Sequence, residues 1–324
     1  MKYNFSFGNT PGIREVLIKN CKGLDTLKFP WNDLDYPEHE GMPELIEHTR
    51  DLIQETTGIF YKWILITGGA TQSINAYLYA AKKNRSEFIQ GVLTNKLYYR
   101  YYPFAIKNHD LYHKACDDVM PGEGEVHLID APSNPLGQTI PGYKAEYTLW
   151  DSCYYSPTYF GLSSPPVPFH EASAGGYNKL TGLNGLRVGW LATQDKRIFD
   201  LALQYLEGEV CGISSLSQWS AIHVAKNANF NKFFKDSWSL ICANKEEFSK
   251  LDHLFGHQSI PEVGMFALME IDNRLEKLFE KSGVKFTDGK TMGDDRKSVR
   301  INLGKTYEET KRMVKEILKQ DKTK

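Results

Sequence analysis

Two spacings of hydrophobic residues alternate along the first part of the chain. The segment PELIEHTRDLIQETT, which begins at Pro43, places Leu45 and Ile53 on one face of an amphipathic helix that Gly58 would end. The next apolar run, WILIT, is short and uninterrupted, as is typical of a buried strand. Helical spacing then returns in TQSINAYLYAAKKN. The pattern therefore predicts a helix, a strand and a second helix in succession.

The alternation of strands and helices continues to about residue 220. Further runs that predict strands are GVLT, EVHLIDA, YTLWD, VPFHEA and LRVGWLAT, and KRIFDLALQYLEG predicts another helix. Strands that alternate with helices indicate an α/β fold with a mostly parallel sheet covered on both faces. Beyond this point long helical stretches surround GMFALMEI and SVRINL, which indicates a smaller α+β domain. We therefore predict a large domain over residues 37–220 and a small domain formed by residues 1–36 and 221–324.

Composition and charge limit the class of partner. The 324 residues carry 39 basic and 40 acidic side chains, a formal net charge of -1, so no global field attracts nucleic acid or a membrane surface. A small-molecule partner is expected instead. The chain shows neither a signal-peptide pattern nor a membrane-spanning apolar run. Its five cysteines are widely spaced, which fits neither a disulfide framework nor a metal site and predicts a cytoplasmic protein: Cys21, Cys116, Cys153, Cys211 and Cys242.

Polar residues follow several predicted strands, at the edge where open parallel sheets bind ligands. ITGGATQS is a glycine-rich turn before a helix, so its backbone N–H groups and the Thr71 hydroxyl form a candidate anion site. APSNPLG places Asn134 after another strand, and LWDSCYYSP places Asp151 and Tyr154 after a third. Each pattern alone is also typical of an ordinary turn or helix cap.

The stretch GGYNKLTGLNGLRVGW holds one lysine, Lys179, among glycines and apolar residues, with Arg187 eight positions later. A lysine in a tight, partly desolvated loop has its ammonium form disfavoured. Its pKa therefore falls, and the free amine becomes a usable nucleophile. This setting predicts a lysine that forms a Schiff base.

Taken in order, GGATQS, LYYRYY, SNPLG, DSCYY and NKLTGLNGLRVGW resemble the motifs of fold-type I pyridoxal-5'-phosphate (PLP) enzymes, the aspartate aminotransferase superfamily. Three of the segments, GATQSINA, DSCYYSP and KLTGLNGLRVGW, are most similar to the branch that holds alliinase and the plant tryptophan aminotransferases. The resemblance runs from about residue 36 to residue 215, and SVRINLG adds a sixth motif near the end. It implies a fold-type I PLP-transferase, with a mostly parallel sheet in the large domain and a smaller α+β domain.

The resemblance also implies a role for each matching residue. Lys179 would form the internal aldimine with PLP and move the proton of the substrate's α-carbon. Asp151 would keep the pyridine nitrogen protonated, so that the ring acts as an electron sink. Tyr154 and Asn134 would bind the phenolic oxygen of the ring. The remaining roles are stacking on the ring by Tyr99, phosphate binding by Ala70, Thr71, Arg187 and a partner subunit's copy of Tyr36, and substrate-carboxylate binding by Arg300 and Asn134.

The sequence departs from the family pattern before the lysine, where serines are usual and Gly176 and Asn178 stand instead. Either the cofactor binds less tightly for lack of a serine hydroxyl, or Ser173 or Ser214 replaces it. Three functions stay open: an aminotransferase acting on an α-amino acid and a 2-oxo acid, a PLP-dependent C–S lyase or decarboxylase, and a non-catalytic cofactor-binding protein. The role that the resemblance gives Tyr36 implies a homodimer with shared sites. Tyr102 and Tyr155 are candidates to receive an aromatic substrate.

Overall fold

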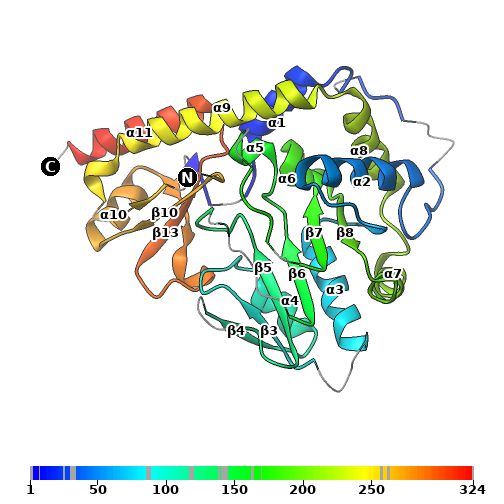
Figure 1. Ribbon diagram of the computed structural model, residues 1–324. Helices are drawn as coiled ribbons and strands as arrows, with labels where there is room; N and C mark the ends of the chain where they lie inside the picture. The colour runs from blue at the N-terminus through cyan, green and yellow to red at the C-terminus, as the bar shows by residue number, and fades with distance from the viewer. Residues whose placement is uncertain are drawn as a thin grey trace.

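The structure is a computed structural model that describes most of the chain. The described residues are 3–6, 8–24, 26–29, 34–84, 89–116, 120–137, 139, 145–161, 164–168, 170–255, 258–260 and 263–322. Figure 1 shows a large sheet with helices around it and a smaller sheet-containing part at the end that carries both termini.

The large part is built on a seven-stranded sheet of order β2-β8-β7-β6-β5-β3-β4. All its strands run parallel except β8, which is antiparallel to both of its neighbours. This arrangement confirms the predicted α/β class and the mostly parallel sheet. The strands are β2 (Trp63–Thr67), β3 (Gly91–Thr94), β4 (Tyr112–Ala115), β5 (Glu125–Asp130), β6 (Tyr147–Asp151), β7 (Ala172–Gly176) and β8 (Gly189–Thr193).

Helices bury both faces of this sheet, and strand β2 shows why. Leu65 points into a core formed with α3 (Ala70–Asn84), α4 (Tyr102–Asn108) and α7 (Lys196–Val210). Its neighbours Ile64 and Ile66 point to the opposite face, against α2 (Pro43–Thr57), α6 (Tyr177–Thr181) and α8 (Ser215–Asn227). Because strand side chains alternate between faces, a continuous apolar run such as WILIT fits only a sheet covered on both sides.

One predicted strand was wrong. Of the run VPFHEA, in which Phe169 lies outside the described residues, only Ala172 belongs to the strand that follows β6; that strand, β7, is ASAGG. This segment lacks large apolar side chains because its neighbours fill the space: a Cβ at Gly175 would overlap the ring of Trp190 on β8. The hydrophobic pattern did not predict β7, because the large side chain in this contact belongs to the neighbouring strand β8.

The smaller part contains a four-stranded antiparallel sheet of order β12-β13-β10-β9. Its strands are β9 (Gln258–Ser259), β10 (Phe266–Glu270), β12 (Thr287–Asp288) and β13 (Ser298–Asn302). At the amino terminus β1 (Tyr3–Asn4) pairs in parallel with β11 (Val284–Lys285), so the two ends of the sequence share this part. The domain boundaries near residues 36 and 220 stay a prediction.

Helices connect and cover the smaller part. They are α1 (Pro11–Asn20), α5 (Pro157–Phe160), α9 (Phe230–Ser249), α10 (Asn273–Lys281) and α11 (Tyr307–Asp321). Helices α1, α5 and α11 all pack against the long helix α9, which crosses the top of Figure 1. Single turns of 3-10 helix lie at η2 (Asn184–Leu186), η3 (Asp252–Leu254) and η4 (Gly289–Met292).

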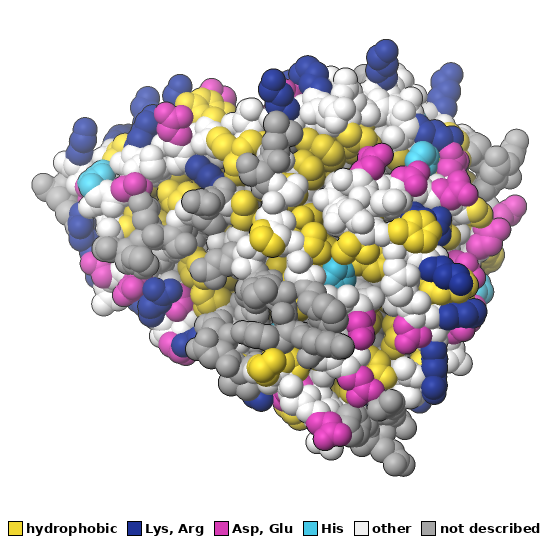
Figure 2. Space-filling model, viewed as in Figure 1, with side chains coloured by type: hydrophobic (Ala, Val, Ile, Leu, Met, Phe, Trp, Pro, Cys, Tyr) yellow, Lys and Arg dark blue, Asp and Glu magenta, His cyan; other side chains and the backbone are white. Residues whose placement is uncertain are grey.

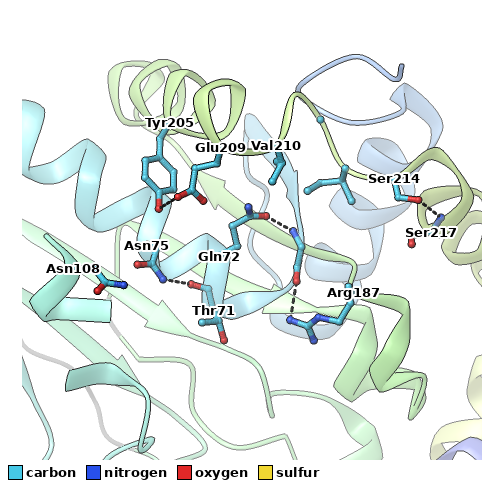
Figure 3. Close-up of a pocket in the computed structure, with 13 residues that line it drawn as sticks. Thr71, Gln72, Asn75, Asn108, Arg187, Tyr205, Glu209, Val210, Ser214 and Ser217 are labelled. Atoms are coloured by element: carbon cyan, nitrogen blue, oxygen red, sulfur yellow. Dashed lines mark hydrogen bonds between the residues drawn. The ribbon is translucent and has the colours of Figure 1, made fainter. Parts of the chain in front are cut away.

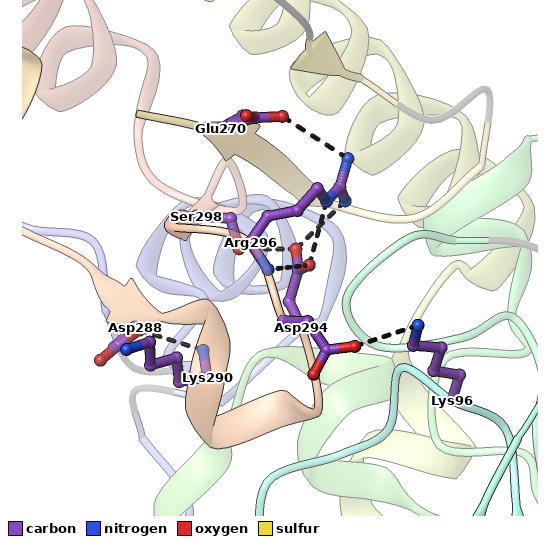
Figure 4. Close-up of polar contacts among 8 residues, drawn as sticks. Lys96, Glu270, Asp288, Lys290, Asp294, Arg296 and Ser298 are labelled. Atoms are coloured by element: carbon purple, nitrogen blue, oxygen red, sulfur yellow. Dashed lines mark hydrogen bonds and ion pairs between the residues drawn. The ribbon is translucent and has the colours of Figure 1, made fainter. Parts of the chain in front are cut away.

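A loop of the smaller part also contacts the segment that follows β3 in the large part. The Lys96 ammonium lies 3.1 Å from the Asp295 carboxylate (Figure 4), and the backbone N–H of Tyr98 donates to the Met292 carbonyl at 3.0 Å. These contacts hold the residues before β13 against the residues after β3. The smaller part therefore carries Arg300, in β13, toward the ligand-binding edge of the large sheet.

Candidate active site

One pocket lies at the carboxyl ends of β5 and β6, beside the amino terminus of α3. Eight of the ten predicted site residues line it, and they come from segments far apart in the sequence: Ala70, Thr71, Tyr99, Asn134, Asp151, Tyr154, Lys179 and Arg187. The other lining residues are Ile74, Asp130, Cys153 and Asn178. These side chains thus lie together at the carboxyl edge of the sheet, which is where parallel sheets bind ligands.

Lys179 lies on the short helix α6, immediately after β7. Its ammonium donates to the backbone carbonyl of Gly8 at 2.6 Å and to Oδ1 of Asn184 at 3.1 Å. Burial lowers the pKa of Lys179 to about 8, and the nearby positive charges of Arg300 and Arg187 lower it as well. A substantial fraction of the amine is therefore neutral near physiological pH, which agrees with the pKa decrease expected from the sequence.

Asp151 ends β6 and is buried. Its carboxylate accepts the Tyr102 hydroxyl at 2.6 Å and the backbone N–H of Cys153 at 3.0 Å. Burial raises the pKa of Asp151 to about 6, although both hydrogen bonds oppose that increase. Tyr102 was a candidate to receive a substrate ring, but its hydroxyl is committed to Asp151. The hydroxyl of Tyr155, the other candidate, donates to the Pro165 carbonyl at 2.8 Å.

A second carboxylate, Asp130, was missed by the sequence analysis. It pairs in register with Asp151 on the adjacent parallel strand and is also buried. Its Oδ2 accepts the backbone N–H of Asn134 at 2.9 Å. Burial first, and the negative charge of Asp151 second, raise the pKa of Asp130 well above its usual range. Asp130 could have been predicted from its position at the end of the strand EVHLIDA, because the same kind of position identified Asp151.

Arg300 lies behind the pocket rather than among its lining residues. Its guanidinium donates to Oδ1 of Asn134 and, at 2.9 Å, to the carbonyl of Ser6. The guanidinium carbon also lies 4.1 Å from the centre of the Phe266 ring. Arg300 is 3% exposed, which excludes a solvent-facing arginine on the strand surface. Its Nε has no hydrogen-bond partner among the described residues, so one buried donor remains available.

The opposite end of the pocket is suited to an anion. Gly69 has a positive φ of 109°, and a Cβ there would lie 2.8 Å from a guanidinium nitrogen of Arg187, so glycine leaves that space open. Helix α3 begins at the next residue and directs its free N–H groups here. Thr71 and Arg187 also line an adjoining cavity of about 560 Å³, in which Arg187 donates to the Gly68 carbonyl at 2.8 Å (Figure 3).

The structure distinguishes the two serines that were expected to replace the missing hydroxyl. Ser214 lines the cavity of Figure 3 together with Thr71 and Arg187. The hydroxyl of Ser173 instead lies 2.8 Å from that of Ser152, inside the sheet. A side chain at Gly176 would overlap Oδ1 of Asn178, which lines the pocket. Asn178 therefore occupies the space that a side chain at position 176 would need.

Tyr36 lies outside the pocket, with 89% of its surface exposed. It borders a second hollow, of about 420 Å³, together with the exposed side chains of Leu34, Val210 and Leu216. Ser214 lines both this hollow and the cavity of Figure 3, so the surface around Tyr36 adjoins the anion-binding end. Tyr36 lines neither the pocket nor the cavity of Figure 3, so its predicted role requires a partner subunit.

Two kinds of feature are absent from the described part of the chain. No helix there is both long enough and apolar enough to cross a membrane. Among the same residues, histidine, cysteine and acidic side chains form no group that could hold a metal ion. On the face shown in Figure 2, basic and acidic side chains are interspersed, as expected from the near-zero net charge.

Comparison with solved structures identifies the class of fold. An aspartate aminotransferase variant from Thermus thermophilus superimposes with a TM-score of 0.79 at 14% identity, covering 99% of this chain and 96% of that one. An archaeal alanine:glyoxylate aminotransferase gives a TM-score of 0.80 at 18% identity, covering 100% and 91% of the two chains. The fold is therefore that of fold-type I PLP-dependent aminotransferases, which confirms the predicted class.

The family follows from the sequence. Residues 38–238 match the model of the allinase family, and the chain belongs to that family. It is 26% identical to tryptophan aminotransferase-related protein 2 of Arabidopsis thaliana, over 93% of this chain and 77% of that protein. It is 23% identical to a (5-formylfuran-3-yl)methyl phosphate transaminase of Methanocaldococcus jannaschii, over 94% and 86%. The predicted branch is confirmed, and PLP is confirmed as the cofactor of this family and fold.

Proposed function

We propose that this protein is a PLP-dependent aminotransferase that moves an amino group between an α-amino acid and a 2-oxo acid. One observation carries the proposal: Lys179, a partly buried lysine with a pKa of about 8, shares a single pocket with the buried carboxylate of Asp151 and with Arg187, which lies beside the amino terminus of α3. The transaminase names of the relatives in both comparisons support the same activity.

The residues present fit PLP. The space left open at Gly69, the amino terminus of α3 and the cation of Arg187 suit the phosphate, with Ala70 and Thr71 beside them. Asp151 suits a protonated pyridine nitrogen, and Tyr99 suits a ring face. Asn134 and Tyr154 suit the phenolic oxygen. When bound, PLP supplies an electron sink for bonds broken at the substrate's α-carbon.

The protein's own groups then have distinct tasks. The neutral amine of Lys179 accepts a proton and later returns it, for which a pKa near the working pH is favourable. Asp151 stays ionised above about pH 6, so it can face a cationic ring nitrogen at physiological pH. Arg300 would fix the substrate carboxylate, because its buried Nε still lacks a partner among the described residues.

The proposal includes a homodimer with shared sites. Its support is the exposed hydrophobic rim of the hollow at Tyr36, which adjoins the anion-binding end of the pocket. Burial of such a rim against a second copy would place the partner subunit's Tyr36 near the phosphate. A cytoplasmic location is also proposed, with support from the five cysteines, all of which are free thiols.

A trapping experiment tests the proposed activity. Borohydride reduction of the PLP-loaded protein, followed by peptide mapping, should label Lys179, and a label on another lysine would reject the assignment. Single-turnover spectra with each amino acid should then identify the substrate by loss of the lysine-bound PLP absorbance. The product decides the reaction: a 2-oxo acid with conserved amino nitrogen supports transamination. Pyruvate with ammonia would show a lyase, carbon dioxide a decarboxylase, and an unchanged spectrum with every amino acid a non-catalytic protein.

A further inference from the structure

Two oxygen atoms accept hydrogen bonds from the amine of Lys179, and neither belongs to a residue that was predicted to form the site. One is the backbone carbonyl of Gly8 in the amino-terminal segment, at 2.6 Å. The other is Oδ1 of Asn184, five positions after the lysine, at 3.1 Å. Lys179 lines the pocket, whereas both acceptors lie outside its lining.

The side chain of Asn184 has only one orientation that satisfies its neighbours. Its Nδ2 donates to the carbonyl of Gly182 at 3.2 Å and to Oγ1 of Thr10 at 3.1 Å. A carbonyl oxygen cannot donate, so the amide nitrogen must face Gly182. Oδ1 is therefore directed to Lys179, and the fully buried Thr10 ties this arrangement to the amino-terminal segment.

Gly8 is the residue that allows its own carbonyl to approach so closely. A Cβ at this position would lie 2.7 Å from the Lys179 nitrogen and 3.4 Å from the Tyr154 hydroxyl. Any larger residue would displace the amine or the segment. The close approach of backbone to amine, rather than a turn, is what requires glycine here.

We propose that Asn184 and the Gly8 carbonyl orient the Lys179 amine, so that its third substituent position faces the pocket. In the neutral amine the two N–H bonds are donated to the two oxygens and the lone pair is directed toward the ligand. When the amine takes up a proton, that lone pair becomes a third N–H bond at the same place. A proton is thus received from, and returned to, one direction. This inference rests on the proposed function, because it assigns to Lys179 the reacting amine.

The titratable and charged groups that face this amine come from several elements. Cys153 and Tyr154 follow β6, Arg187 follows η2 and Arg300 belongs to β13. The two arginines disfavour the ammonium form. Asn184 and Gly8 are neutral acceptors, so they add direction without adding charge.

The test measures the cofactor-free protein first. The pKa of the Lys179 amine is obtained from the pH dependence of its acetylation, read by mass spectrometry of the Lys179 peptide. Asn184→Asp should raise that pKa by about one unit or more, because an opposite charge would replace a neutral acceptor. Asn184→Leu should lower it, because the ammonium loses an acceptor. Asn227→Leu, which changes an exposed asparagine of α8, is the matched control and should leave the pKa unchanged.

The second measurement is the rate at which each variant captures added PLP on Lys179, followed by absorbance across pH. Asn184→Leu should reduce the limiting rate at high pH, where the amine is neutral in every variant, by about tenfold or more, because the lone pair is no longer directed. Gly8→Ala should reduce it too, by displacing the amine while Asn184 is intact. If Asn184→Leu does not fold, Asn184→Asp and Gly8→Ala decide the outcome.

Two failures are distinguishable. A wild-type protein that captures no PLP on Lys179 would contradict the proposed function itself. Wild-type capture with an unchanged Lys179 pKa and an unchanged limiting rate in the Asn184 variants would overturn only this inference. A purely structural role for Asn184 would lower the melting temperature without moving the pKa of the amine.

Discussion

Replacing Arg300 by lysine keeps the positive charge and removes the planar pair of donors. We expect the KM for the amino acid to rise strongly while PLP stays bound, because Arg300 lies behind Asn134 and not at the anion-binding end. Inhibition by simple dicarboxylates or 2-oxo acids should weaken in parallel. Lysine offers a point charge at one position, whereas the guanidinium holds a carboxylate in a fixed plane.

The magnitude follows from what the buried guanidinium contacts. It donates to Asn134, to the Ser6 carbonyl at 2.9 Å and to Oγ1 of Thr287 at 3.4 Å, and it lies over Phe266. These contacts are neutral, so the charge pair at stake is the proposed one between Arg300 and the substrate carboxylate, and disrupting a buried, hydrogen-bonded pair of that kind costs about 2 to 5 kcal/mol. Since lysine retains the charge, the lower part of that range applies, about 2 to 3 kcal/mol. That corresponds to a rise in KM of roughly 30- to 150-fold.

The assay is steady-state kinetics with cofactor occupancy checked by absorbance. Arg296→Lys is the matched control, because Arg296 lies four residues earlier, is half exposed and pairs with Asp294 at 3.0 Å (Figure 4). It should leave KM within about twofold of wild type. Unchanged KM and kcat in Arg300→Lys at full occupancy would refute the reasoning. The substrate carboxylate would then bind elsewhere, or the substrate would not be an α-amino acid.

Three further substitutions test the other groups of the pocket. Lys179→Ala should abolish turnover yet still bind PLP, measured by equilibrium dialysis; loss of binding would mean that the remaining contacts do not suffice. Asp151→Asn should lower kcat on the order of 10²-fold with the fold intact by circular dichroism, and a near-normal kcat would place the ring nitrogen elsewhere. Asp130→Asn should raise the melting temperature of the cofactor-free protein at pH 7. Because the pKa of Asp130 is raised in the folded state, the stability of the wild-type protein falls as the pH rises above about 3.9. The increase in melting temperature should therefore vanish near pH 4, and an increase that does not depend on pH would contradict this explanation.

Much of the large sheet was predictable because its strands and helices bury side chains at regular spacing. Helix α2 begins at Pro43 and ends before Gly58, as predicted, and Gly58 has the positive φ of 75° that a helix terminus favours. The strand VPFHEA was wrong because β7 is made of small residues whose bulk is supplied by Trp190. The spacing of hydrophobic residues is a property of one segment, so it cannot indicate a strand whose space is filled by a side chain of the neighbouring strand.

The candidate site divides in the same way. Asp151 and Asn134 were predictable because strand ends meet at one edge of the sheet. Gly8 was not, because nothing in the amino-terminal segment indicates that it returns over Lys179. Tyr102 was interpreted as a candidate to receive an aromatic substrate, because its hydrogen bond to Asp151 forms only when α4 and the end of β6 come together in the fold. Residues that act through tertiary contacts therefore needed the structure, whereas residues at strand ends did not.

One physical cause connects the perturbed groups of this pocket. Burial disfavours the ammonium of Lys179 and the carboxylates of Asp151 and Asp130 alike, so the site without ligand holds acids with raised pKa values beside a lysine with a lowered one. Each shift lowers the stability of the folded chain over part of the pH range. A ligand that carries both an anionic and a cationic group would pair with Arg187 and Asp151 and remove part of that cost. The same desolvation that makes Lys179 a usable amine thus also favours occupancy of the site, and ligand binding should stabilise the fold.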